Sequence, residues 1–192
     1  LLTIGSMAMM ATAAVDFQTQ YNLSFEQTIE SDTVLLPDGW TIGANLSSDE
    51  ATNNFAVASD EQVKEGNYSL KIKHTAIGTV NDRVWRVVSD LTPGAEYMVT
   101  GYVYVTAPMN NLGIMVFDGN TGASGANWVS GLSGATGILG EAKQTKEVWM
   151  PLTAYFTAPE SGVVSLAVGG FNSASTNGTA YFDDIAIYEV GD

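Results

Sequence analysis

Carboxylates are the most abundant chemically active side chains in this sequence. Its 192 residues include 21 Asp and Glu against 7 Lys and Arg, which gives a formal net charge of −14. Residues 1–63 contain no Lys or Arg at all. Because calcium prefers oxygen ligands, some of these carboxylates are candidate calcium ligands. The alternative is a solvated acidic surface that keeps the protein soluble.

Residue counts exclude several other kinds of chemistry. The absence of cysteine removes disulfides, thiolate metal sites and thiol nucleophiles. One histidine, His74, is too few for a multi-histidine metal site, and we expect it at the surface rather than as a general base. No acidic pair stands in a recognisable glycosidase motif, so we expect no enzymatic activity. A pI near 4.1 argues against nucleic acid and anionic membranes as partners.

The first fifteen residues carry no charge and form a segment distinct from the predicted domain of residues 16–192. As a helix they would span about 22 Å, which is too short to cross a bilayer core of about 30 Å. Two interpretations remain open: a signal-peptide remnant, or a strand that completes a sheet edge of a neighbouring subunit. The assembly interpretation depends on the apolar side chains Leu1, Leu2, Ile4, Met7, Met9, Met10 and Val15.

From residue 16 onward, short apolar or alternating runs are separated by Gly, Pro, Asn, Asp and Ser, a pattern typical of strands and turns. This predicts an all-β fold, an antiparallel jelly-roll β-sandwich with an apolar N-terminal extension. The expected strands are 23–28, 68–74, 82–90, 96–106, 113–117, 147–157, 163–169 and 179–189.

Four aromatic residues are candidates for contact with a ligand. Alternation along residues 97–105 places the valines on the core side and turns Tyr102 and Tyr104 to the opposite surface, where a ring can stack on a sugar. Trp85 lies between two arginines, and Trp128 lies in a long loop rich in Gly, Ser and Ala. For each of them, a purely structural packing role is the alternative.

Several short motifs match a known family when they are taken in order along residues 22–189. They are NLSFE at 22–26, PDGW at 37–40, VKEGNYSLKI at 63–72, LTPGAEY at 91–97, Trp149, FTAP at 156–159 and AYFDDI at 180–185. In this order they resemble carbohydrate-binding-module β-sandwiches of the family 4, 9 and 22 kind. The resemblance implies that Trp40 and Trp149 belong to the fold's own motif and lie in the core.

The resemblance implies a structural calcium ion near the edge of the sandwich. Carried over by motif, its ligands are Glu26 and Asp183, with Asp184 and the carbonyls of residues 65–67 less firmly placed. Alternation along the last strand puts Asp183 and Asp184 on opposite sides, so only one of them can face a given site.

Two functions fit these features. We favour a non-catalytic extracellular structural protein that polymerises with copies of itself through its N-terminal segment into a surface filament or sheath. The alternative is a calcium-stabilised carbohydrate-binding module that recognises a polysaccharide. Both imply a secreted or cell-surface location and no membrane span.

Overall fold

The structure is a computed structural model, which describes residues 15–32, 34–74, 79–80, 83–107, 112–120, 147–170, 173–174 and 178–191. Within these ranges all regular elements but one short helix are β-strands, as predicted. The elements are α1 (Phe17–Gln20), β1 (Thr28–Ser31), β2 (Val34–Pro37), β3 (Thr41–Ile42), β4 (Phe55–Ser59), β5 (Ser69–His74), β6 (Thr79–Val80), β7 (Arg83–Val88), β8 (Glu96–Ala107), β9 (Leu112–Asp118), β10 (Met150–Thr157), β11 (Val164–Gly170), β12 (Ser173–Ala174) and β13 (Gly178–Glu189).

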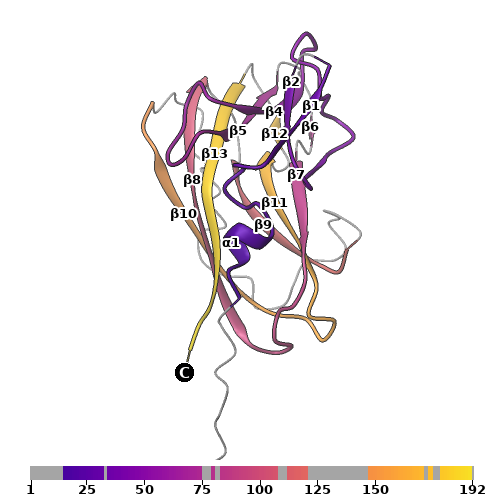
Figure 1. Cartoon of the computed structure of the whole chain (residues 1–192), viewed down its shortest axis with the longest axis vertical. Coiled ribbons are helices and arrows are strands. Elements are labelled where there is room, and N and C mark those ends of the chain that lie inside the picture. The colour runs from indigo at the N-terminus through magenta and orange to yellow at the C-terminus, as the bar shows by residue number, and fades with distance from the viewer. Residues whose placement is uncertain are drawn as a thin grey trace, which may run out of the picture.

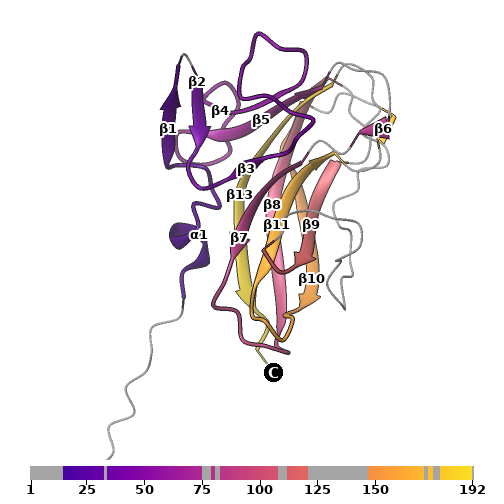
Figure 2. The ribbon, with the colours of Figure 1, turned by 90° about the vertical axis from the view of Figure 1, so that its right-hand side faces the viewer.

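Two antiparallel sheets face each other (Figures 1 and 2). The five-stranded sheet has the order β10-β8-β13-β5-β4, and the four-stranded sheet has the order β3-β7-β11-β9. Two small two-stranded sheets, β1-β2 and β12-β6, complete the described strands. The predicted all-β sandwich of the jelly-roll type is thereby confirmed.

The core lies between the two sheets and follows the expected alternation along β8. Tyr97, Val99, Val103 and Val105 are at most 1% exposed. The residues between them are half-buried on the outer side of the sheet, the side away from the core. Burying apolar side chains of this size contributes roughly 1.5–3 kcal/mol each, so this inner face is a main source of stability.

Residues 23–27 form a turn and a loop and not a strand, so the prediction of a strand at 23–28 is wrong. Asn22 and Phe25 have positive φ angles of 51° and 63°, which interrupt an extended strand. Asn22 closes the turn: its side-chain amide donates to the carbonyl of Gln27 at 2.7 Å and accepts from the Gln27 N–H at 2.8 Å. Leu23 and Phe25 are fully buried, so their apolar character reflects core packing and not strand alternation.

Helix α1 packs against β13. Asp16 caps it by accepting from the Thr19 N–H at 3.2 Å, and Phe17 places its ring edge-on to Tyr97 in the core. Residues 1–14, with the assembly residues Leu1, Leu2, Ile4, Met7, Met9 and Met10, lie outside the described residues. The division at residue 15 stays a prediction.

Candidate functional site

Trp85 lies on the outer face of the four-stranded sheet. The strand register places it beside Thr41 on β3 and Ala167 on β11, and Ala167 in turn faces Met115 on β9. Trp85 is half-buried and packs against a small apolar cluster of Met115, Phe117 and Ala167. Part of the indole is therefore exposed above an apolar floor.

Arg83 lies two residues before Trp85 on the same face. Its guanidinium carbon is 5.3 Å from the centre of the Phe117 ring, and the residue is 7% exposed. Burial lowers the pKa of Arg83. Within the described part of the chain, its Nη1 has no hydrogen-bond partner. A buried donor without a partner costs about 1–3 kcal/mol. The nitrogen is covered in this structure, so a ligand oxygen contacts it only after the atoms that cover it move.

Tyr102 and Tyr104 lie on the outer face of the five-stranded sheet, so the structure does not bring them together with Trp85. The Tyr104 ring is 5.4 Å from Trp149 and 6.4 Å from Tyr181, centre to centre. Lys64 places its Nζ 4.6 Å from the centre of the Tyr102 ring. Trp149 is half-buried on this outer face rather than in the core, whereas Trp40 is a core residue as expected.

The upper end of this outer face is held together by a charged network. Tyr181 donates to Glu61 Oε2 at 2.5 Å, and Lys71 Nζ donates to Glu61 Oε1 at 2.5 Å. The hydrogen bond from Lys71, followed by the one from Tyr181, lowers the pKa of Glu61. Burial and the neighbouring Glu61 raise the pKa of Tyr181. The side chains of Glu61, Lys71 and Tyr181 bind one another, so they are not free to bind a ligand.

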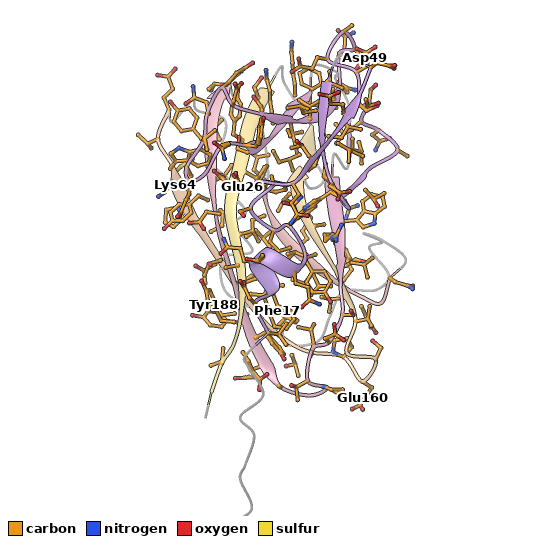
Figure 3. The ribbon with its side chains drawn as sticks, in the orientation of Figure 1. Phe17, Glu26, Asp49, Lys64, Glu160 and Tyr188 are labelled. Carbon is orange, nitrogen blue, oxygen red and sulfur yellow. The ribbon has the colours of Figure 1, made fainter. Side chains whose placement is uncertain are left out.

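Two exposed tyrosines at the lower end of the same sheet were not found by the sequence analysis. Tyr155 on β10 is 42% exposed and Tyr188 on β13 is 52% exposed. Figure 3 shows Tyr188 at the lower part of β13. The signal in the sequence was strand alternation. On each strand the tyrosine directly follows a core-facing residue, so the tyrosine faces outward.

The acidic pair Glu26 and Asp183 meets at residues 64–68. Asp183 is fully buried, and its Oδ2 accepts from the backbone N–H groups of Lys64 at 2.7 Å and Glu65 at 3.1 Å. Glu26 accepts from the backbone N–H of Asn67 at 2.9 Å. Burial raises the pKa of Asp183 to about 6, and the negative charge of Glu26 adds to this shift. Both carboxylates thus contact this segment, but they accept from its N–H groups and not from the carbonyls that the resemblance implied as further ligands, so the calcium assignment stays a prediction.

Asp184 has a different environment because the last strand is irregular. Tyr102 pairs with Asp183 while Thr100 pairs with Ala186, so β13 contains an extra residue, a β-bulge. Asp184 sits in the bulge with a φ of 51° and accepts from the Gln18 side chain at 3.0 Å. The bulge breaks the strand alternation from which opposite orientations of Asp183 and Asp184 were expected.

Position 66 requires glycine, because the backbone there has a positive φ angle and lies against the Glu26 side chain. Its φ is 77°, and a Cβ added there would lie 2.2 Å from Glu26 Oε1. We expect Gly66→Ala to lower the free energy of unfolding by about 1–2 kcal/mol from backbone strain alone, and further by displacing Glu26. Chemical denaturation followed by circular dichroism measures the change.

Gly94→Ala is the matched control for this variant. Gly94 has the same φ of 77°, with no atom within 4 Å of an added Cβ. The difference between the two variants therefore isolates the displacement of Glu26. Equal destabilisation by both would contradict a structural role for the Glu26 contact.

Other predicted residues are placed as follows. Met115 and Phe117 lie on the four-stranded sheet, whereas Tyr102 and Tyr104 lie on the five-stranded sheet. His74 is fully buried, so the expectation of a surface residue is wrong. Trp128 lies outside the described residues. In the described part of the chain there is no group of three or more Asp, Glu or His side chains arranged to hold a metal ion.

Comparisons with known proteins identify the architecture. No protein-family model matches the sequence, and no curated protein matches it. The CBM22-1 xylan-binding domain of Paenibacillus barcinonensis Xyn10C superposes with a TM-score of 0.54 at 17% identity, covering 88% of this chain and 92% of that one. A CBM4 structure gives a TM-score of 0.53 at 19% identity, covering 88% and 98%.

The fold is that of carbohydrate-binding modules. A third structure, the CBM22-1 and GH10 modules of Clostridium thermocellum Xyn10B with xylohexaose, gives a TM-score of 0.51 at 16% identity. The match covers 81% of this chain and 27% of that longer protein. The resemblance seen in the sequence motifs is therefore confirmed at the level of the fold. In addition, no helix among the described residues is long and apolar enough to cross a membrane.

Proposed function

We propose that this protein is a non-catalytic carbohydrate-binding module whose ligand lies on the outer face of the four-stranded sheet. The observation that carries the proposal is the part-exposed indole of Trp85 beside the buried guanidinium of Arg83 and its unpartnered Nη1. A sugar ring presents apolar C–H groups to an aromatic face and hydroxyls at its edge. The indole suits the first, and the guanidinium suits the second if a sugar hydroxyl displaces the atoms that cover Nη1.

The proposal includes the absence of catalysis and an extracellular location. Asp183 is the carboxyl group whose pKa is raised toward that of a general acid, but it is fully buried and held by backbone N–H groups. A polysaccharide cannot reach it there. Solved neighbours of the same fold are described as xylan-binding, and polysaccharides of that kind lie outside cells, which supports a secreted or cell-surface protein.

Calorimetry against a panel of neutral oligosaccharides from β-glucan, xylan and mannan tests this proposal. We expect saturable binding of at least one of them by the full chain. If none of these oligosaccharides binds measurably, the carbohydrate-binding function is overturned. Because the chain carries a net charge of −14, a polyanionic glycan serves as the negative control.

We further propose that calcium binds at Glu26 and Asp183. Two carboxylates that contact the same segment, one of them buried with a raised pKa, form a site where a cation would relieve the repulsion between them. Backbone N–H groups of residues 64–68 face these carboxylates, so further oxygen ligands would come from water or other carbonyls. Asp184 does not fit this site because it faces Gln18.

We also propose self-association through the N-terminal segment as a second function. Val15 is 45% exposed and lines a hollow of about 350 Å³ with Phe17, Ile187 and Tyr188. The uncharged segment thus joins the domain at an apolar recess, which favours contact with another apolar surface.

Deletion of residues 1–15 tests self-association. We expect a folded monomer, because Asp16, the capping residue of α1, is retained. Size-exclusion chromatography with light scattering and electron microscopy compares it with the full chain. Assembly that is unchanged by the deletion would rule this function out.

A further inference from the structure

The outer face of the five-stranded sheet carries an aromatic surface that no hydrogen bond or ring contact explains. Tyr155 on β10 and Tyr188 on β13 both pair with Met98 on β8, so the three residues form one row across the sheet. The side chains of Tyr155 and Tyr188 make no hydrogen bond or ring contact to any described residue. Two exposed, unpartnered rings on a flat face are typical of a binding surface.

The spacing of this row suits an extended ligand. Neighbouring strands lie about 4.8 Å apart, so the backbones of Tyr155 and Tyr188 are roughly 10 Å apart with Met98 between them. A linear chain of sugar rings crossing the strands can stack on each tyrosine and lie over the methionine between. Tyr102 is a poorer stacking partner because Lys64 already covers its ring at 4.6 Å.

Polar groups lie directly beside the row. A hollow of about 280 Å³ is lined by Thr100, Thr153, Asp184 and Tyr188, among others. Thr153 pairs with Thr100, so both hydroxyls lie on the same face of the sheet. Each threonine is two residues along its strand from the row of Tyr155, Met98 and Tyr188. Hydroxyl and carboxylate groups beside stacking rings form the combination that recognises sugar hydroxyls.

We infer that Tyr155, Tyr188, Thr100, Thr153 and Asp184 form a second glycan-binding surface, independent of Trp85, for a neutral linear polysaccharide. The inference rests on the proposed carbohydrate-binding function. The net charge of −14 disfavours an anionic polymer here. Because the two surfaces are on opposite sheets, one protein binds two polysaccharide chains and joins them.

Variants that remove one surface at a time test the inference. In a Trp85→Ala background, the full chain is titrated with xylan, β-glucan and mannan oligosaccharides by calorimetry. We expect residual binding that Tyr155→Ala with Tyr188→Ala weakens by at least roughly tenfold, since each ring contributes a separate stacking contact. Tyr155→Phe with Tyr188→Phe keeps the rings and should retain most of the binding.

Ile29→Ala is the matched control, because Ile29 is 49% exposed on β1, outside both surfaces. It should change neither affinity nor stability. With long polysaccharide, the unsubstituted chain should produce turbidity that the tyrosine variant does not.

The outcomes separate this inference from the proposed function. One outcome is that Trp85→Ala abolishes binding, while the tyrosine substitutions have no effect in a chain that keeps Trp85. That result overturns the second surface and leaves the proposed function standing. Binding lost with the tyrosine substitutions and unaffected by Trp85→Ala supports the second surface and overturns the placement at Trp85. An unsubstituted chain that binds none of the three glycans overturns both.

Discussion

Replacing Trp85 by alanine should weaken glycan binding about 100-fold, which corresponds to about 2.7 kcal/mol, in a chain that also carries Tyr155→Ala and Tyr188→Ala. The tyrosine substitutions remove the second surface, so the remaining affinity reports on the four-stranded sheet alone. Trp85 supplies the exposed indole on that face, and tryptophan is among the residues whose truncation most often costs this much. Isothermal titration against the best oligosaccharide of the panel measures the loss.

Two controls accompany this prediction. Trp85→Phe retains an aromatic ring and should lose much less affinity than Trp85→Ala. Thermal unfolding should show that Trp85→Ala remains folded, because the indole is half-buried and lies outside the main core. An alanine variant that binds as tightly as its parent would refute the role of Trp85.

In the absence of calcium, the stability of this protein should fall as the pH rises from about 4 to 7. The pKa of Asp183 is about 6 in the folded chain against an ordinary value of 3.8, so the folded state holds this proton more tightly. Its contribution to the free energy of unfolding is complete below pH 4 and is lost as the pH passes 6. The change amounts to at most about 3 kcal/mol.

Calcium should reverse this trend, because a bound cation stabilises the ionised carboxylate and adds stability by mass action at higher pH. Denaturation curves at several pH values, with and without calcium, measure both effects. Asp183→Asn is the reference, since Glu61 and other acids titrate in both proteins and cancel in the comparison. If native and Asp183→Asn chains show the same pH dependence without metal, the raised pKa is refuted. A calcium-dependent shift that survives Glu26→Ala and Asp183→Ala would refute the ligand assignment.

Strands with strict alternation were predictable from the sequence, as the segment at 96–106 shows. Its valines and Tyr97 are buried, whereas Tyr102 and Tyr104 point outward, because side chains on a strand alternate between faces. Short strands such as Phe55–Ser59 were not predicted. All five of its residues are buried, and a run of apolar residues lacks the alternation that distinguishes a strand from a loop.

The placement of functional side chains could be predicted only in part. Glu26 and Asp183 were paired through family-like motifs, and the structure brings both to residues 64–68. Asp184 was less firmly placed, and the β-bulge that turns it toward Gln18 depends on pairing with a neighbouring strand. Tyr155 and Tyr188 went unnoticed because they are far apart in the sequence and meet only through Met98.

Composition and local alternation are properties of neighbouring residues, so the acidity, the lack of cysteine and the short antiparallel strands could be predicted from the sequence. Which aromatic residues share a surface depends on the tertiary structure. Strand order places Trp85 on one sheet and Tyr155 with Tyr188 on the other, and strand order is fixed by long-range packing of the core rather than by local sequence.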